Sequence, residues 1–154
     1  MPRIRLHEQP HYEFTYQTLV QARDITYTDR HLAHYAVVQI AREARVDMLR
    51  ALGLRELDLG DGKTGVITRD VAVNFKGEAF LFDTLCVESC VEEISQDSLR
   101  VFHRITRAGE LIALAEAGLI GFDYGSRAIA PIPDAFNRAL ALWQGLQETF
   151  RNRA

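Results

Sequence analysis

The segment from about His34 to Leu52 constrains the fold more than any other part of this chain. Apolar residues recur there at three- and four-residue steps, and Gly53 follows. This spacing predicts a helix of about five turns that ends at the glycine. Between Tyr35 and Ala41, apolar side chains lie on nearly every side of that helix. We therefore expect this half to be buried deeply, with a sheet wrapped around it. The second half should reach water, because it carries Arg42, Glu43, Arg45, Asp47 and Arg50.

Alternating apolar and polar residues mark the strands. From Tyr12 to Ala22 nearly every second residue is apolar, which predicts a half-buried strand of about ten residues before the helix. After a loop at 58–62, further strand-like stretches follow at about 65–75, 84–94, 99–105 and 111–124. One face of the first stretch should carry Ile67, Val71, Val73 and Phe75. The last stretch is apolar on both faces, as is typical of a central strand that is covered on both sides.

The chain is expected to close with a short second helix. Gly125-Ser126 should end the sheet, and Pro131 and Pro133 exclude helix and central strand in the segment that follows. Asp134 is a helix-start signal. A helix over about 134–150 would carry an apolar stripe of Phe136, Leu140, Trp143, Leu146 and Phe150. The order of elements predicts an α+β fold with a five-stranded antiparallel sheet around one long helix. We expect a single domain over residues 1–154, with its core at about 12–133.

Composition narrows the functional classes. Eighteen Lys and Arg against 21 Asp and Glu give a net charge of −3, which argues against a protein that binds nucleic acid. No apolar run reaches the roughly 18 residues of a membrane helix, so we expect no membrane insertion. Cys86 and Cys90 are too far apart along one strand to form a disulfide, and a reducing, cytoplasmic location fits them. Clusters with metal-ligand spacing are absent from the sequence, so we expect no bound metal.

Reactive side chains concentrate between the first strand and the long helix. The segment contains Asp24, Tyr27, Thr28, Asp29, Arg30, His31, His34 and Tyr35. It leads into a helix start, where backbone N–H groups are free and the helix dipole is positive. A carbonyl oxygen that gains negative charge would be stabilised there. The alternative is an ordinary capped helix start, with Asp29 or Thr28 as the cap and solvated histidines.

Residues 23–34 read Arg-Asp-Ile-Thr-Tyr-Thr-Asp-Arg-His-Leu-Ala-His, and Arg42-Glu43-Ala44-Arg45 follow in the helix. This pattern resembles the 4-hydroxybenzoyl-CoA thioesterase-like hotdog proteins, in which an Asp-x-x-Gly-His-Val/Leu-Asn-Asn loop enters a helix that reads Glu-Ala-Arg. Phe82-Asp83-Thr84 is similar to the family's Gly-Asp opening of its third strand, and Pro131-Ile132-Pro133 to its Pro-Ile-Pro. The resemblance covers about 120 residues, from Phe14 to about Pro133, and the order of strands and helix is that of the hotdog fold.

The resemblance implies hydrolysis of an acyl-CoA thioester without metal or cofactor, CoA being part of the substrate. It also implies a homodimer or homotetramer with active sites at the subunit interface. The acyl group would lie along the buried helix, and the thioester oxygen would meet backbone N–H groups at the helix start. A carboxylate in the loop would attack or activate water.

The alignment departs from the family at the catalytic position. Counted back from Glu43-Ala44-Arg45, the family's Gly falls on Arg30 and its catalytic Asp on Tyr27, while His31 matches the family's His. Asp29 is the nearest substitute carboxylate. Two functions therefore stay open: a thioesterase that uses Asp29, and a non-catalytic binder of acyl-CoA or acyl carriers. A hotdog hydratase ranks below both.

The remaining candidates have named alternatives. His34 would polarise the carbonyl or orient water, or else be a half-buried hydrogen-bonded histidine. Tyr27 and His31 take part in the site or pack the loop, and Glu43 serves as a base or forms a salt bridge. Tyr35 and Asp24 are candidates for substrate binding, although Asp24 is better explained as holding the loop through backbone N–H groups. His103, on the apolar side of its strand, should be an interior or interface histidine. CoA phosphates would meet cations from the set Arg69, Lys76, Arg104 and Arg107, each of which could instead be solvated.

Overall fold

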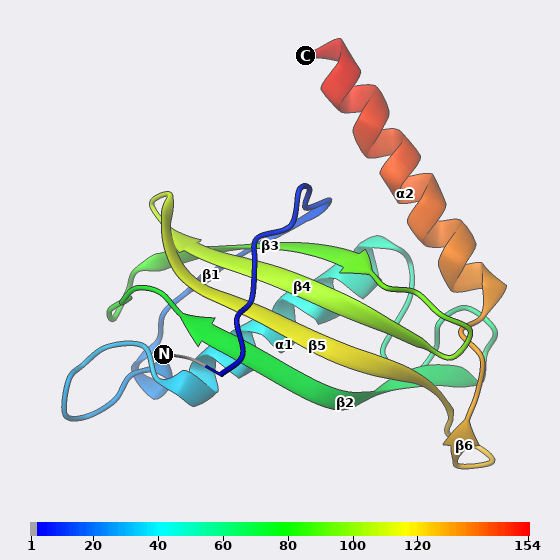
Figure 1. The fold of residues 1–154 in the computed structure, drawn as a ribbon, viewed down its shortest axis with the longest axis horizontal. Helices are drawn as coiled ribbons and strands as arrows, with labels where there is room; N and C mark the ends of the chain where they lie inside the picture. The colour runs from blue at the N-terminus through cyan, green and yellow to red at the C-terminus, as the bar shows by residue number, and fades with distance from the viewer. Residues whose placement is uncertain (1–2) are drawn as a thin grey trace.

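The computed structural model describes residues 3–154 and shows one antiparallel sheet curved around a long helix (Figure 1). The elements are β1 (Phe14–Leu19), a 3-10 turn η1 (Ala22–Asp24), α1 (His34–Ala51), β2 (Thr64–Phe75), β3 (Thr84–Glu92), β4 (Ser98–Arg107), β5 (Glu110–Asp123), β6 (Ala128–Ile129) and α2 (Asp134–Arg153). The sheet has the order β1-β3-β4-β5-β2, and β6 pairs with β5. The predicted α+β arrangement is confirmed.

The short strand β6 was not predicted. Gly125-Ser126 turns the chain but does not end the sheet, because the Asp123 carboxylate accepts hydrogen bonds from the backbone N–H groups of Gly125 at 2.8 Å and Ser126 at 3.1 Å. The turn leads Ala128 and Ile129 back alongside β5. The sheet therefore has six strands, where five were expected.

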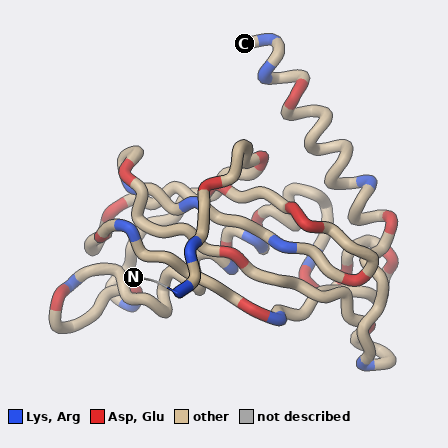
Figure 2. The backbone as a smooth tube through the Cα atoms, viewed as in Figure 1, with Lys and Arg blue, Asp and Glu red and all other residues tan. Residues whose placement is uncertain are grey.

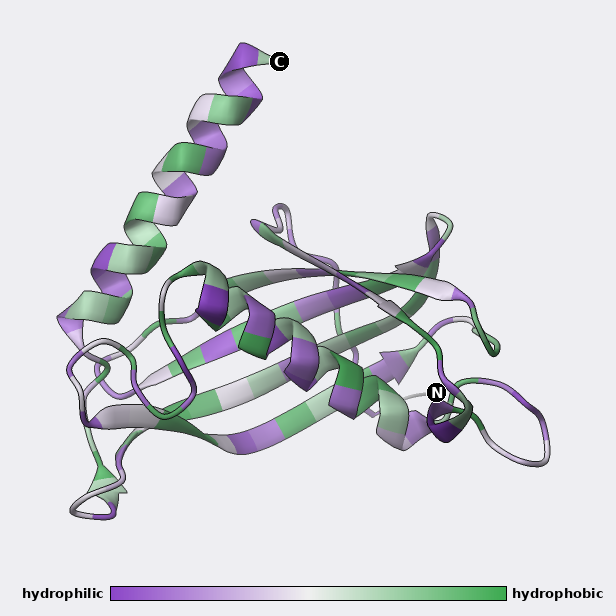
Figure 3. Cartoon of the chain, turned by 180° about the vertical axis from the view of Figure 1, so that it is seen from behind, coloured by the Kyte–Doolittle hydropathy of each residue, from purple (hydrophilic) through white to green (hydrophobic). Residues whose placement is uncertain are grey.

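Helix α1 lies across the concave face of the sheet (Figure 3). It ends as predicted, because Gly53 has a φ of +73° and the N–H of Leu54 reaches back to the carbonyl of Leu49 at 2.8 Å. The side that faces the sheet includes Ala36, Ala44 and Met48, all of which are buried. Small alanines let the helix approach the strands closely, and this packing holds the helix start in a fixed place beside the sheet.

Two expectations for α1 were wrong. The first half is not covered on every side, since Tyr35 and Val38 are exposed. The sheet covers only one side of the helix, so both residues keep much of their surface exposed. In the second half Arg45 is buried rather than solvated. The loop after α1 folds back and supplies Glu56, whose Oε1 accepts hydrogen bonds from Arg45 Nη2 at 2.7 Å and Nε at 3.1 Å.

A bulge in β2 overturns the predicted face of Ile67. The register with β5 shifts between Thr68 and Asp70, which leaves Arg69 as an extra residue. Such a bulge reverses the alternation of side chains along the strand. Val66 before the bulge and Val73 after it both pack in the core. Ile67 therefore faces the opposite side of the sheet from Val73, rather than sharing its face.

The N-terminal segment, residues 3–13, crosses the face of the sheet opposite α1 (Figure 1). Leu6 is buried there, and its N–H donates to Asn74 of β2 at 2.7 Å. Glu8 forms an ion pair with Arg104 of β4 at 2.8 Å. This segment helps to cover β5 from outside, in agreement with the prediction that β5 is buried on both faces. In the strand order, however, β4 is central and β5 lies next to it.

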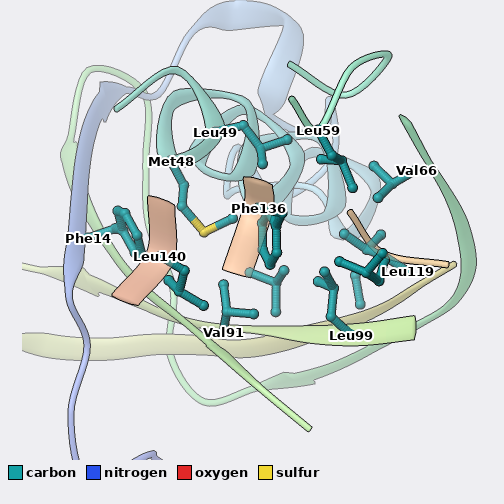
Figure 4. Packing of buried hydrophobic residues seen from close by; sticks show 13 residues of the cluster. Phe14, Met48, Leu49, Leu59, Val66, Val91, Leu99, Leu119, Phe136 and Leu140 are labelled. Atoms are coloured by element: carbon teal, nitrogen blue, oxygen red, sulfur yellow. The ribbon is translucent and has the colours of Figure 1, made fainter. Parts of the chain in front are cut away.

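Only the first half of α2 closes the core. Figure 4 shows Phe136 and Leu140 of this helix among Met48, Leu49 and Val91. The Trp143 ring stacks on Phe14 with centroids 5.3 Å apart. Beyond this point the helix projects from the body (Figure 1), and the predicted stripe residues Leu146 and Phe150 are exposed. The helix is thus longer than predicted, and its end does not close the fold. No helix among residues 3–154 is both long and apolar enough to cross a bilayer.

Candidate functional site

The start of α1 carries no side-chain cap. Its N-cap residue is Ala33, so neither Thr28 nor Asp29 caps the helix. The N–H of Ala33 donates to the carbonyl of Asp24 at 2.7 Å. The next N–H groups, of His34 and Tyr35, have no acceptor among residues 3–154. Free N–H groups at the positive end of the dipole can stabilise an oxygen that becomes negative.

The loop before α1 is closed at its base by backbone contacts between its two ends. Ile25 and Leu32 form a bridge, and the N–H of Thr26 donates to the carbonyl of His31 at 3.0 Å. The Asp24 carboxylate accepts the N–H of Gln21 at 2.8 Å, so this residue holds the loop as its sequence position suggested. These bonds fix the ends of the loop, while residues 27–30 project from the body (Figure 1).

Tyr27 and Asp29 lie in this projecting part. Tyr27, which aligns with the family's catalytic Asp, is fully exposed at 104%. The Asp29 N–H donates to Thr26 Oγ1 at 3.4 Å, and the Asp29 carboxylate accepts from the Thr28 hydroxyl at 3.4 Å. Both contacts are internal to the loop. The Asp29 carboxylate is therefore exposed and free to meet a ligand or another chain.

The two histidines between β1 and α1 contact different neighbours. His31 is half-buried, with its Nδ1 3.9 Å from the Glu78 carboxylate in the loop after β2. His34, the first residue of α1, is exposed, and its ring lies edge-on to Tyr35 at 5.7 Å. The Tyr35 hydroxyl donates to the carbonyl of Arg23 at 3.1 Å. The structure thus brings His34 and Tyr35 together at the free N–H groups and places His31 against the neighbouring loop.

Glu43 lies on a different side of α1 from the exposed Val38. Its carboxylate accepts hydrogen bonds from the Tyr16 hydroxyl of β1 at 3.2 Å and from the Gln39 amide at 3.4 Å. The predicted alternative for this residue, a salt bridge, is not what the structure shows, since both partners are uncharged. Tyr16 belongs to the edge strand β1, so Glu43 faces the β1 edge of the sheet.

The four candidate phosphate-binding cations are scattered. Arg104 is on the outer face, tied to Glu88 at 2.6 Å as well as to Glu8. Arg107 bonds Asp83 at 3.0 Å and Glu110 at 3.1 Å. Arg69 at the β2 bulge and Lys76 after β2 are exposed. Figure 2 shows basic and acidic residues interspersed over the sheet. The structure therefore does not gather these four cations at the helix start.

A cavity of about 150 Å³ opens between α1 and the β2 side of the sheet. Sequence reasoning missed it, because it depends on which strands face which side of the helix. Its walls come from α1, β2, β4 and β5, and it is lined by Val38, Ala41, Arg42, Arg45, Thr68, Val71, His103, Ala115, Glu116 and Ala117. Val38 follows His34 by one helical turn, so the cavity begins close to the free N–H groups.

His103 is an interior histidine, as predicted. It is 2% exposed, and its Nδ1 lies 2.7 Å from the Ser89 hydroxyl on β3. Burial, and secondarily the charge of Arg45, lowers the pKa of His103 to about 3. The imidazole is therefore neutral at physiological pH.

Glu56 keeps the cations near the cavity paired. Partial burial by itself raises the pKa of Glu56, but hydrogen bonds and charges from Arg45 and Arg42 outweigh it and hold that pKa below its usual value. The carboxylate is therefore ionised, and Arg45 is neutralised inside the fold. No cluster of three or more His, Cys, Asp or Glu side chains that could hold a metal ion occurs in residues 3–154.

The chain is similar to a known protein family and to several solved structures. Residues 23–140 match the family model described as the thioesterase-like superfamily. A search of curated proteins found no match. Among solved structures, a 1,4-dihydroxy-2-naphthoyl-CoA thioesterase from Synechocystis superposes with a TM-score of 0.74 at 21% identity, covering 83% of this chain and 95% of its own.

Two further structures show the same fold. A protein from Staphylococcus aureus in complex with CoA has a TM-score of 0.76 at 18% identity, over 84% of this chain and 82% of its own. A gentisyl-coenzyme A thioesterase has a TM-score of 0.72 at 21% identity, over 82% of this chain and 98% of its own. At such identities the likeness shows the fold alone, and it confirms the predicted hotdog architecture.

Proposed function

The chain belongs to the thioesterase-like superfamily, and we propose that it hydrolyses an acyl-CoA thioester to the free acid and CoA. The observation that carries this proposal is the uncapped start of α1. Its free N–H groups, on His34 and Tyr35, lie one turn from a mostly apolar cavity along the same helix. An oxyanion site next to an acyl-sized cavity is what thioester hydrolysis requires.

The reaction would use a water molecule and no cofactor. Asp29 removes a proton from water as the water oxygen bonds to the thioester carbonyl carbon. The carbonyl oxygen becomes negative and is stabilised by the N–H groups of His34 and Tyr35, with the His34 ring beside it. The C–S bond then breaks, and CoA leaves as the thiol after it takes up the proton. In an alternative with the same product, Asp29 attacks the carbonyl itself and water cleaves the resulting anhydride.

We further propose that two chains are needed for each site. The strand β2 is an edge of the sheet with exposed Val71 and Phe75, and exposed Tyr35 and Val38 of α1 lie on the same side of the chain. An apolar, unpaired edge of this kind is suited to pairing with another copy. The Asp29 loop projects from the body and is free to meet a partner. A homodimer would therefore complete the site, and a homotetramer would be a pair of such dimers.

CoA as the carrier is supported by one of the similar structures, which holds CoA. We also propose a cytoplasmic location, with which the free thiols of Cys86 and Cys90 are consistent.

The activity is tested by incubating the protein with a panel of acyl-CoAs and a thiol reagent. We expect release of CoA thiol, and we expect Asp29→Asn to lower kcat by about 10²- to 10⁴-fold with the fold intact. Asp97→Asn, another exposed carboxylate in a turn, is the matched control and should retain full activity. Activity retained in Asp29→Asn would transfer the role of base to Glu43 or to a carboxylate of the neighbouring chain.

One observation favours a second function. Tyr27 occupies the family's Asp position and points into solvent, so a non-catalytic acyl-CoA or acyl-carrier binder remains the competing proposal. Binding across the panel without thiol release would establish it and remove the hydrolase proposal.

A further inference from the structure

The distal half of α2 turns its apolar side away from the body. Leu142, Leu146 and Phe150 are 69%, 48% and 66% exposed, and the half-buried Ala139 precedes them on the same side of the helix. We call these four residues the outer stripe. They lie where α2 projects (Figure 1), and Figure 3 shows hydrophobic bands, in green, along this part of the helix. Apolar side chains gathered in this way at a surface mark an interaction site.

The side of the distal half that faces the body is polar. The Gln144 amide donates to Glu13 Oε1 at 3.3 Å, and Gln147 and Arg151 line a cavity of about 270 Å³ together with residues 9–13 of the N-terminal segment. At 3.6 residues per turn, the outer stripe is displaced by about 100° around the helix from these polar residues. The helix therefore offers polar groups to its own chain and apolar groups to the outside.

The rotation of α2 about its axis is fixed at Trp143. Its ring stacks on Phe14 with centroids 5.3 Å apart, and its indole N–H donates to the carbonyl of Glu13 at 3.0 Å. Turning the helix to bury the outer stripe would break both contacts and bring Leu140 out of the core. Because apolar surface is stabilised when it leaves water, the outer stripe is best explained by a contact with another molecule.

Spacing and charge point to another apolar helix as the partner. The outer stripe repeats at steps of three and four residues, which is the spacing of a seam between two packed helices. Between residues 139 and 150 the one charged residue is Glu148, and it lies on the opposite side of the helix from the stripe. A charged partner would therefore find no counter-charge. The outer stripe of a second copy has the required character, and most homo-oligomers pair identical surfaces around a two-fold axis.

An antiparallel pair satisfies the charges and leaves room for both bodies. With Leu142 of one helix opposite the partner's Leu146, the basic end of each α2, Arg151 and Arg153, comes level with the partner's Asp134. The helix dipoles then oppose each other as well. In a parallel pair the basic ends would lie together. The two bodies would also compete for the same space, since the axes of packed helices are only about 8–10 Å apart.

The available area sets the strength of this contact. At their exposure, the three large side chains of the outer stripe present roughly 350 Å² of apolar surface per chain. With flanking atoms, a pair would bury about 1,000 Å² in total, which is just below the range of about 1,200–2,000 Å² for stable interfaces. We therefore expect a dissociation constant on the order of 10–100 µM. In dilute solution the pair is dissociated and adds nothing to the stability of one chain.

We propose that the outer stripe of α2 is an interface at which two copies of this chain pair, helix against antiparallel helix. The contact is separate from the β2 edge, so it joins dimers formed through β2 into a tetramer. The loop before α1, where hydrolysis is proposed, lies at the other end of the molecule (Figure 1). The inference therefore goes beyond the proposed function and does not depend on it.

Sedimentation from about 1 µM to about 300 µM brackets the expected affinity. We expect the mass of the wild type to double over this range from its value in dilute solution. Leu142→Lys should raise the dissociation constant of that step by about 10-fold or more, because it places a charge at the centre of the pair. Ala141→Lys is the matched control. It adds the same charge one residue away, at an exposed position on the other side of α2, and should leave the doubling unchanged.

Exchanged charges test the antiparallel arrangement. There, position 142 of one copy faces position 146 of the other, so Leu142→Glu with Leu146→Lys places opposite charges across the interface. Leu142→Lys with Leu146→Lys places like charges there. The first double variant should associate about 10-fold more tightly than the second. Circular dichroism and melting temperatures show that each variant is folded. Equal association of the two would reject the antiparallel pair, because in a parallel pair each position faces itself and both variants repel.

A mass that does not change with concentration, or a doubling that Leu142→Lys leaves intact, would overturn the inference. So would a wild type that stays one species but binds vesicles of phosphatidylcholine and phosphatidylglycerol and loses that binding in Leu142→Lys. The outer stripe would then be a lipid-binding surface. The hydrolase proposal fails separately, in the acyl-CoA assay, where Leu142→Lys should leave kcat unchanged. If no acyl-CoA is hydrolysed, the mass measurement still decides on the pairing of α2.

Discussion

At the residue scale, two residues other than glycine have a left-handed backbone conformation. Arg30 has a φ of +57° and Phe82 a φ of +67°, and both occupy positions where the family pattern has glycine. A side chain in this region costs free energy that glycine does not. The backbone at these two positions therefore has the shape that glycine favours.

Phe82 offers a direct measurement of that cost. We expect Phe82→Gly to have a free energy of unfolding about 1 kcal/mol higher than Phe82→Ala, because only glycine relieves the positive φ. Chemical denaturation of the two variants gives the difference. At an ordinary loop position alanine is the more stable of the two, so an equal or reversed order would show that the positive φ carries no cost here.

The buried His103 predicts a dependence of stability on pH. Its pKa is about 3 in the folded chain against 6.5 for an ordinary histidine. Between these values the unfolded chain binds a proton that the folded chain does not, so stability falls as pH drops from about 6.5 toward 3. The slope from this residue approaches about 1.4 kcal/mol per pH unit.

Denaturation of the wild type and His103→Gln at several pH values isolates this contribution. Other acid-sensitive groups are common to both proteins, so the difference between the two slopes belongs to position 103. Identical slopes between pH 6 and pH 4 would mean that His103 protonates freely in the folded state.

At the scale of elements, the N-terminal half of α2 packs into the core, and its C-terminal half projects from the body. Phe136 is 0% exposed within the core, and Phe150 is 66% exposed on the same helix. Both residues belong to the same apolar stripe of the helix, so the periodicity of the sequence predicts that both are buried. The difference arises because the sheet and α1 extend only as far as the first half of α2, and the second half meets only polar side chains of the N-terminal segment, Glu13 and His11. The family match also ends at residue 140.

The two phenylalanines make a matched pair of variants. Phe136→Ala should lower the free energy of unfolding by about 3–5 kcal/mol, because it opens a cavity in the core. Phe150→Ala should change it by less than about 0.5 kcal/mol. Calorimetry or denaturant titration distinguishes them. A large loss in Phe150→Ala would indicate that the end of α2 packs against another chain in solution.

At the scale of the whole molecule, the β2 edge of the sheet and the adjoining side of α1 are not covered by other parts of the described chain. The candidate oxyanion groups, the rim of the cavity and the apolar edge strand all lie at surfaces that the chain itself does not cover. We expect the protein to have at least the mass of a dimer in analytical ultracentrifugation. Phe75→Lys, which places a charge at the β2 edge, should shift it toward the monomer and reduce thioester hydrolysis.

Leu19→Lys is the control for this prediction. Leu19 is an exposed apolar residue on β1, the opposite edge of the sheet, and its replacement should leave the mass unchanged. A dimer that survives Phe75→Lys and dissociates in Leu19→Lys would move the interface to the β1 edge and remove the basis for a site shared across β2.

The sequence by itself determined the two helices, the five long strands and the family. The limits of α1, the consecutive antiparallel strands and the double burial of β5 followed from periodicity, because local geometry sets the spacing of apolar residues along each element. The Glu-Ala-Arg turn and the loop before α1 carried the resemblance, and the family membership was confirmed. The segment around Asp29 and His34 was found in the same way, through its density of reactive side chains.

Only the tertiary structure decided which of these residues meet. It placed Asp29 on a projecting loop, buried Arg45 against Glu56, and joined His103 to Ser89 across two strands. One bulge at Arg69 reversed the face of Ile67. Such contacts depend on strand register and on where a loop folds back, and a shift of one residue moves a side chain to the other face of a sheet. Spacing along the chain does not record that choice, so the cavity and its histidine became visible only in the folded molecule.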